Sequence, residues 1–332
     1  MRPVVSTLAA LALTAVIPTT ASAEVEAAAT SNVATAINDS GVVVGRKGST
    51  GVRWAANGTV TRLGTLPGSD ITQPAAINSS GVTVGWHNPN GVGRAANWDA
   101  AGKITLLPVP AGMHSDAFDI NTAGVIIGSL SPAGGPVRWE TTGAITTLAS
   151  LPGYGVAKAE ALNDSGIAVG RATRPGPEPE STEDQAVRWD SSGAVTALPP
   201  LVAGKQSAAY DINSNGVIVG AAQDATGVFR PVQWDSAGNI TKLADRLTAV
   251  ESVIAINNNG EIIGFTSGPG RTDPARWDSS GTLTRLKQLS SDAWTIPSDL
   301  NNNGVAVGMD QSDSGAINAV RWDRAGNVTK LP

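Results

Sequence analysis

The chain contains no cysteine, so neither a disulfide bond nor a catalytic thiolate is available to it. Charge is also scarce: 15% of the 332 residues are Asp, Glu, Lys or Arg, and the formal net charge is -5. The basic residues are spread singly along the sequence, which disfavours nucleic acid and anionic membranes as partners. Stability must therefore come from buried apolar surface, and a chain of about 300 residues can supply enough of it.

Long apolar runs are missing as well, except at the N-terminus. Arg2 is followed by an apolar run over residues 4–17 and by Ala21-Ser22-Ala23, which is the pattern of a cleavable secretory signal. The run has about 14 residues, below the roughly 18 that a membrane-spanning helix needs. We predict a secreted, extracellular product without a membrane span, divided into a signal peptide over residues 1–23, a short linker over 24–30 and a repeat domain over 31–332.

A motif of the form Ile/Leu-Asn-x-x-Gly recurs at intervals of 40 to 50 residues, and self-similarity of this period indicates a repeat architecture. Its asparagines are Asn38, Asn78, Asn121, Asn163, Asn213, Asn257 and Asn301. A tryptophan keeps pace with them, at Trp54, Trp98, Trp139, Trp189, Trp234, Trp277 and Trp322. Seven copies fill the chain after the predicted linker.

Each copy is predicted to contain four short strands, which we call A to D. Strand A ends at the Ile-Asn pair, strand B is an apolar run such as residues 41–45, strand C ends at the tryptophan and strand D is a Thr-x-Leu run. The A–B and C–D connections place Asn or Asp first and Gly fourth, as in residues 257–260 and 235–238. This spacing predicts tight hairpins in which glycine adopts a left-handed conformation.

Seven four-stranded antiparallel units predict an all-β fold, a seven-bladed β-propeller built from seven four-stranded repeats. A linear β-solenoid is the structural alternative, but hairpins within each repeat favour blades. One large ring at the same place in every repeat is expected to fill the space between neighbouring blades.

Ring closure depends on which connection crosses a blade, a span of about three strand spacings or roughly 14 Å. Either the B–C or the D–A connection could cross. We expect the B–C connection to do so, because the N-terminal strand pair, near residues 34–45, would then complete the last blade beside the strands ending at Trp322 and Leu331.

The repeat resembles the HAF repeat of extracellular repeat proteins. The resemblance rests on the pattern Ile-Asn-x-x-Gly-x-Val-Val-Gly, on the strand that ends in Trp, and on Thr-x-Leu-x-x-Leu-Pro-Gly, and it covers residues 31–332. The His-Ala-Phe triplet of that family is replaced here by sequences such as Gly51-Val52-Arg53-Trp54. The resemblance implies an extracellular location and a propeller-like fold, and it implies no reaction or substrate.

Because successive strands alternate in direction, all tight hairpins lie on one face and all B–C and D–A connections lie on the other. We call the second face the variable face, because it holds most of the variation, including the Pro- and Glu-rich insertion over residues 174–184. Variable loops on rigid strands are where binding functions usually lie. Aromatic and histidine side chains predicted for this face form our candidate ligand site: Trp86, His87, His114, Tyr154, Phe265 and Trp294. Packing of these side chains onto the blades is the alternative interpretation.

Catalytic candidates are few. Asp119, Asp211 and Asp299 stand two residues before the repeat asparagine, where carboxylates could act as acid and base or simply bind a turn amide or a neighbouring arginine. The arginines that precede tryptophan, such as Arg188 and Arg321, are expected to pair between blades or at the surface. No Gly-x-Ser-x-Gly motif is present, and two loop histidines make neither a triad nor a zinc motif.

Two functions remain open at this point. The favoured one is an extracellular binding or scaffold module for carbohydrate or another surface polymer, acting as a monomer without a cofactor or metal. The alternative is a polysaccharide-active hydrolase or lyase.

Overall fold

The computed structural model describes most of the predicted repeat domain. The described ranges are 31–89, 91–132, 134–178, 180–243, 250–268, 271–290, 294–312 and 315–332. The predicted signal peptide, its cleavage after Ala23 and the linker over 24–30 lie outside the described residues. Strands and turns make up the described ranges, and none of these ranges contains a helix.

Strands follow one another in groups of four, one group for each sequence repeat. We number these repeats 1 to 7 in chain order. The first strands are β1 (Asn32–Ile37), β5 (Ser69–Ile77), β9 (His114–Ile120), β13 (Val156–Leu162), β17 (Ser207–Ile212), β21 (Val250–Ile256) and β25 (Trp294–Leu300). The second strands are β2 (Val43–Lys47), β6 (Thr83–Pro89), β10 (Ile126–Ser131), β14 (Ala168–Pro175), β18 (Ile218–Gln223), β22 (Ile262–Gly268) and β26 (Ala306–Gln311).

The remaining strands complete each group. The third strands are β3 (Thr50–Trp54), β7 (Arg94–Trp98), β11 (Gly135–Trp139), β15 (Thr182–Trp189), β19 (Phe229–Trp234), β23 (Arg271–Trp277) and β27 (Ile317–Trp322). The fourth strands are β4 (Val60–Arg62), β8 (Ile104–Leu106), β12 (Ile145–Thr147), β16 (Val195–Ala197), β20 (Ile240–Lys242), β24 (Leu283–Arg285) and β28 (Val328–Lys330).

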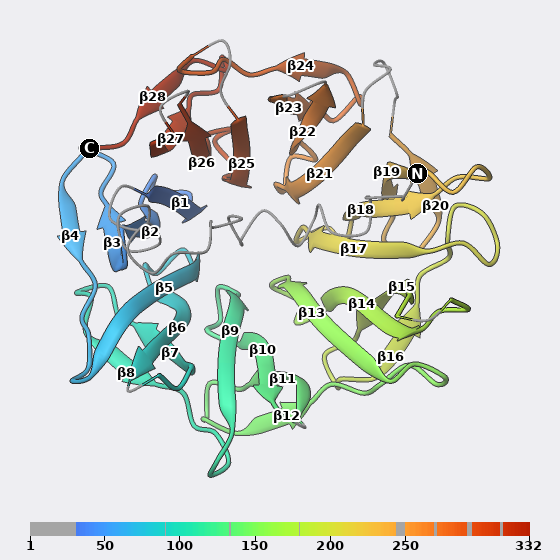
Figure 1. Cartoon of the computed structure of the whole chain (residues 1–332), viewed down its shortest axis with the longest axis horizontal. Coiled ribbons are helices and arrows are strands. Elements are labelled where there is room, and N and C mark those ends of the chain that lie inside the picture. Colours follow the sequence, from blue (N-terminus) through green and yellow to red (C-terminus); the bar gives the residue numbers. More distant parts are fainter. Residues whose placement is uncertain are drawn as a thin grey trace.

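The strands form antiparallel sheets arranged in a ring, with each first strand nearest the centre and each fourth strand at the rim (Figure 1). Repeats 1 to 5 are separate four-stranded sheets in chain order. Repeats 6 and 7 belong to one eight-stranded sheet, in which a single parallel residue pair, Thr272 with Trp294, joins β23 to β25. The all-β prediction is confirmed.

The prediction that the B–C connection crosses a blade is wrong. Strands β1 and β2 pair with β3 in their own repeat and not with β27 or β28 of the last one. The reason is length: only two residues separate β2 from β3, whereas six separate β4 from β5. Two residues cannot span roughly 14 Å at about 3.5 Å per residue. The D–A connection therefore crosses, and the ring closes without exchanging a strand.

A close backbone approach explains the glycine that ends each Val-Val-Gly run. A β-bulge shifts the register of β1 against β2 between Ala34 and Ala36. It brings the Val33 carbonyl oxygen to 2.0 Å from the place where a Cβ on Gly45 would lie. The other six repeats have the same register shift. Bulges increase strand twist, and here they bend the innermost strand of each sheet.

The predicted hairpins are present. In the first of them Gly41 has a φ of 75°, and its amide donates to the Asn38 carbonyl oxygen at 2.9 Å. This position of the turn requires a left-handed backbone conformation, which glycine adopts without a steric cost.

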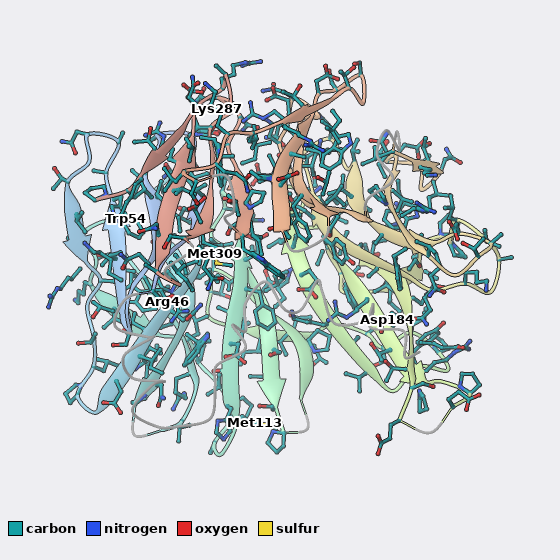
Figure 2. All side chains as sticks on the ribbon, turned by 45° about the horizontal axis from the view of Figure 1, so that its top comes forward. Arg46, Trp54, Met113, Asp184, Lys287 and Met309 are labelled. Carbon is teal, nitrogen blue, oxygen red and sulfur yellow. The ribbon has the colours of Figure 1, made fainter. Side chains whose placement is uncertain are left out.

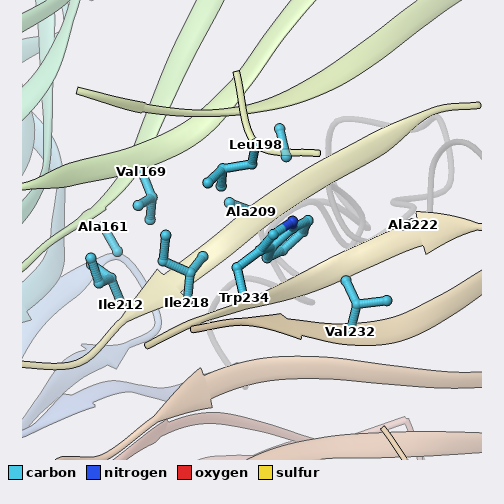
Figure 3. Packing of buried hydrophobic residues seen from close by; sticks show 10 residues of the cluster. Ala161, Val169, Leu198, Ala209, Ile212, Ile218, Ala222, Val232 and Trp234 are labelled. Atoms are coloured by element: carbon cyan, nitrogen blue, oxygen red, sulfur yellow. The ribbon is translucent and has the colours of Figure 1, made fainter. Parts of the chain in front are cut away.

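The seven repeat tryptophans are buried between neighbouring repeats, each with 0–1% of its surface exposed. Trp234 of repeat 5 packs against Leu198 and Val169 of repeat 4 (Figure 3). Its indole Nε1 donates to the Pro199 carbonyl oxygen at 2.8 Å. Trp54 lies at the seam between the first and last repeats (Figure 2), where it packs with residues of repeat 7. The prediction that these rings fill the space between neighbouring repeats is confirmed.

The repeat asparagines form a closed belt around the hairpin face. Each Nδ2 donates to the backbone carbonyl oxygen of the asparagine in the next repeat, at 3.0–3.3 Å. The last of these bonds runs from Asn301 to Asn38 and so joins repeat 7 to repeat 1. Each Oδ1 accepts the amide four residues further on, for example Val42 at 3.0 Å. The belt is buried, with 3–6% of each asparagine exposed.

Candidate functional site

The two faces of the ring differ in the hydrogen bonds of their turns and in the length of their connections. On the hairpin face the turns bind to one another, as when the Asn302 amide donates to Asp39 Oδ1 at 2.8 Å. Arginines that precede the tryptophans add to this network: Arg188 Nη1 donates to the Ser236 carbonyl oxygen of the next repeat at 3.3 Å, which confirms the expected pairing between repeats for this residue. The variable face instead carries the longer connections. A ligand site is therefore expected there.

Four of the six candidate side chains reach the surface of the variable face or lie partly below it. Trp294 begins β25 with 45% of its surface exposed, and His114, also exposed, begins β9. Trp86 in β6 and Tyr154 before β13 are half-buried. These residues come from repeats 7, 3, 2 and 4. They are thus distributed over four repeats: Trp294 and His114 begin innermost strands, Trp86 lies in a second strand, and Tyr154 precedes β13.

The other two candidates are buried. His87 has no exposed surface, and its Nδ1 lies 2.7 Å from Ser69 Oγ. Burial, together with the nearby Arg94 charge, lowers the pKa of His87, so this imidazole is neutral at physiological pH. Phe265 is 5% exposed within β22. Neither side chain is presented to solvent in this structure.

The position of Trp86 and Phe265 within their repeats explains why neither residue lies in a loop. Trp86 and Phe265 both directly follow the glycine of the Val-Val-Gly position, as Gly85-Trp86 and Gly264-Phe265. They therefore occupy the same place in the second strand of repeats 2 and 6, because β6 and β22 continue beyond that glycine. Aligning the repeats would have revealed this equivalence in advance.

Asp119, Asp211 and Asp299 tie neighbouring repeats together. One carboxylate oxygen of each accepts the amide of the next residue, and the other accepts an amide of the following repeat. For Asp119 these donors are Ile120 at 2.8 Å and Leu162 at 2.7 Å. The expected turn amide or arginine partner is thus replaced by strand amides. Both oxygens of each carboxylate are occupied by the fold itself.

These three carboxylates titrate at unusual pH. Burial raises the pKa of Asp119 to about 7, against the opposing effect of its two amide donors, and the Asp299 charge raises it further. Burial likewise raises the pKa of Asp299 to about 6 and that of Asp211 well above its ordinary value. The three residues are half-buried, and desolvation of their carboxylates is the main cause of the raised pKa values.

Asp116, a fourth acidic residue with a raised pKa, lies nearer the variable face. Burial raises the pKa of Asp116 in β9, while the charges of His114 and Lys158 lower it. His114 is two residues away on the same strand and therefore on the same side of it.

A cavity on this face lies in repeat 4, at the Pro- and Glu-rich insertion. Its volume is about 640 Å³, which is in the range of small-ligand sites. The walls include Val156, Thr173, Arg174, Pro177, Glu178 and Glu180. The sequence singled out the insertion but not Val156, which is the first residue of β13 and is 66% exposed.

Two kinds of feature are absent from the described ranges. Nowhere in them do three or more His, Asp or Glu side chains gather as metal ligands would. No helix long and apolar enough to cross a membrane occurs in the same ranges.

Comparisons with known proteins define the fold. No protein-family profile matches the chain, and no curated protein matches it. Among solved structures, the β-propeller domain of the Trilobed protease from Pyrococcus furiosus, which has an open velcro topology, is 11% identical with a TM-score of 0.63, covering 92% of this chain and 96% of that one.

Two further solved structures are also similar to the chain in fold. Virginiamycin B lyase from Staphylococcus aureus is 15% identical with a TM-score of 0.54, covering 78% of this chain and 84% of that one. Puromycin hydrolase is 18% identical with a TM-score of 0.61, covering 93% of this chain and 55% of that one. Similarity at this level of identity concerns the fold, and it supports a β-propeller.

Proposed function

We propose that this chain is an extracellular, seven-bladed β-propeller of the HAF-repeat type that binds a carbohydrate or another surface polymer on its variable face. The count of seven treats the two halves of the eight-stranded sheet as separate blades, because one residue pair joins them. Secretion is inferred from the signal-like N-terminus, and the family from the repeat motif.

The exposure of Trp294 carries the proposal. A large aromatic side chain that is 45% exposed stands at the start of an innermost strand, on the face with the variable connections. An aromatic ring offers a flat apolar surface on which the C–H face of a sugar can stack. The hairpin face offers no comparable surface, because its turns and arginines are bonded to one another.

A glycan array followed by calorimetry with the best oligosaccharide tests this function. Trp294→Ala should weaken binding by about 1–3 kcal/mol, the range for an aromatic residue at the centre of an interface. Val60→Ala is the matched control, because Val60 is a 37% exposed apolar residue at the hairpin-face end of β4. Absence of binding to every polymer on the array would reject the proposal.

The alternative, polymer cleavage by a hydrolase or lyase, is favoured by the raised pKa of Asp116 beside His114. A release assay on the polymers that bind distinguishes the two functions. If the chain cleaves them, Asp116→Asn should abolish release while leaving binding intact. Binding without release supports the binding module.

A further inference from the structure

The insertion of repeat 4 lies in a long hairpin. Strands β14 and β15 each have eight residues, more than the second and third strands of any other repeat. Their tip is held by its own hydrogen bonds: the Gly176 amide donates to the Ser181 carbonyl oxygen at 2.8 Å, and Ser181 Oγ donates to the Glu178 carbonyl oxygen at 2.7 Å. These bonds restrain the backbone on both sides of the tip, and such restraint lowers the entropic cost of binding.

Apolar surface lines much of the cavity. Val156 and Pro177 are exposed and contribute to its walls, and the Gly155 amide ties the D–A connection to Thr173 O at 3.2 Å. Val156 has 66% of its surface exposed, so its methyl groups are accessible from the cavity. The cavity therefore offers apolar contact to a ligand.

The charge of the cavity is negative. Its cation, Arg174, is already neutralised, because its Nε and Nη2 both donate to Glu183 Oε2, at 2.9 and 2.7 Å. The same guanidinium lies over the Tyr154 ring, 5.2 Å from its centre. The carboxylates of Glu178 and Glu180 form no ion pair with any part of the chain that the structure describes.

Backbone strain marks the same place. Glu180 has a φ of 63°, which is a left-handed backbone conformation that residues other than glycine, asparagine and aspartate rarely adopt. Such a residue persists where its surroundings hold it, and strain of this kind gathers at binding sites.

We propose that the repeat 4 cavity binds a sugar unit that carries a free amine, with the apolar face of the sugar against Val156 and Pro177 and its ammonium group facing Glu178 and Glu180. This inference rests on the proposed polymer-binding function and specifies the class of polymer, a polysaccharide of deacetylated amino sugars. A pyranose ring combines an apolar C–H face with a charged substituent at its edge, and the cavity combines the same two features in complementary form. The openness of the site at an exposed hairpin suits one unit of a longer chain.

Calorimetry with three matched oligosaccharides tests the proposal at mildly acidic pH, where the sugar amine is protonated. The probes are the hexamers of glucosamine, N-acetylglucosamine and glucose. The glucosamine hexamer should bind at least about tenfold more tightly than the other two, and added salt should weaken its binding. Equal affinities for all three would overturn the inference while leaving polymer binding intact.

Variants locate the site. Glu178→Gln and Glu180→Gln should each weaken binding of the glucosamine hexamer by roughly threefold, and the double variant by about tenfold, as expected for partly exposed ion pairs. Asp70→Asn is the control, because Asp70 is an exposed acid on the same face in repeat 2, and it should change nothing. Val156→Lys supplies a second, independent test, since a lysine at the cavity wall should compete with the ligand and abolish binding. Thermal melting verifies that all variants are folded.

Two outcomes would point elsewhere. If Trp294→Ala abolishes binding and the Glu178→Gln, Glu180→Gln double variant does not reduce it, the sugar lies at Trp294 and the cavity inference is wrong. If an oligolysine peptide binds as tightly as the glucosamine hexamer, the site recognises basic peptides and the assignment to amino sugars is wrong.

Discussion

Closure of the ring can be tested at Asn301, because the seam between repeats 7 and 1 has no chain connection across it. The Asn301 side chain makes three hydrogen bonds there: Nδ2 donates to Asn38 O at 3.0 Å, and Oδ1 accepts the amides of Asn303 and Val305 at 3.1 and 2.9 Å. The residue is 4% exposed. Replacing it with alanine removes all three bonds and leaves the Asn38 carbonyl group without its side-chain donor.

The expected cost follows from these three bonds. Each contributes about 1 kcal/mol net, and each buried group that loses its partner adds its desolvation cost, so we expect Asn301→Ala to destabilise the protein by about 3–5 kcal/mol. At roughly 2–4 °C per kcal/mol, the melting temperature should fall by about 6–20 °C. Differential scanning calorimetry measures this change.

A second variant separates closure from simple loss of bonds. Asn213 makes the same three bonds, to Asn257 O and from the amides of Asn215 and Val217, but it joins repeats that are consecutive in the chain. Asn213→Ala should lower the melting temperature by a similar amount. Faster amide hydrogen exchange in β1 and β25 should appear in Asn301→Ala alone, because only there can the ring open. Equal exchange in the two variants, or a melting temperature of Asn301→Ala within about 1 °C of the parent, would refute this account.

Three further outcomes follow from the fold. Gly45→Ala should destabilise the protein by at least about 2 kcal/mol in urea unfolding, because its Cβ would meet the Val33 carbonyl oxygen at 2.0 Å; a neutral effect would contradict the bulge geometry. Trp234→Ala should cost about 3–5 kcal/mol in the same assay, since it leaves a cavity between two repeats, and Trp234→Phe should cost less. Because the folded pKa of Asp119 is about 7 and its ordinary value is 3.8, the unfolded state loses this proton first as pH rises. Stability should therefore fall between about pH 4 and pH 7 by up to about 1.4 kcal/mol per pH unit, and a pH series of unfolding curves on Asp119→Asn should show a shallower slope.

The repeat itself could be predicted from the sequence because its landmarks serve local geometry. A glycine with positive φ at a turn, such as Gly41, and a large ring between sheets, such as Trp234, are required by the backbone and by packing in every copy. Strand order was mispredicted because it depends on where strands end. Lys47 and Thr50 leave two residues between β2 and β3, and nothing in the motif indicated so short a connection.

The candidate site was predicted less well because exposure depends on neighbours from other repeats. His87 lies in a strand that continues past its apolar run and is covered completely, whereas Trp294, at the start of its strand, keeps 45% of its surface in water. The cavity at Val156 joins a D–A connection to an insertion in the same repeat, so its two walls come from segments that the sequence shows separately. The secretory signal and the family resemblance stay predictions.

The asparagine belt and the inner carboxylates explain how a ring without disulfides or strand exchange can close. They also explain why the two faces differ in their capacity to bind a ligand. Each repeat needs a donor that reaches its neighbour and an acceptor that holds its own turn, and one asparagine amide, such as that of Asn38, provides both. Once these side chains and the inner carboxylates, such as Asp299, are bound to backbone groups, they are no longer available for recognition without loss of stability. The variable face also has bonds between repeats, as when Trp54 Nε1 donates to Pro332 O at 2.9 Å across the seam. These bonds use backbone carbonyl groups, which any residue supplies, so the connections on this face can vary in composition at little cost to the fold. A ligand site is therefore expected where the repeats differ from one another, and repeat 4 differs in having the longest second and third strands of the seven.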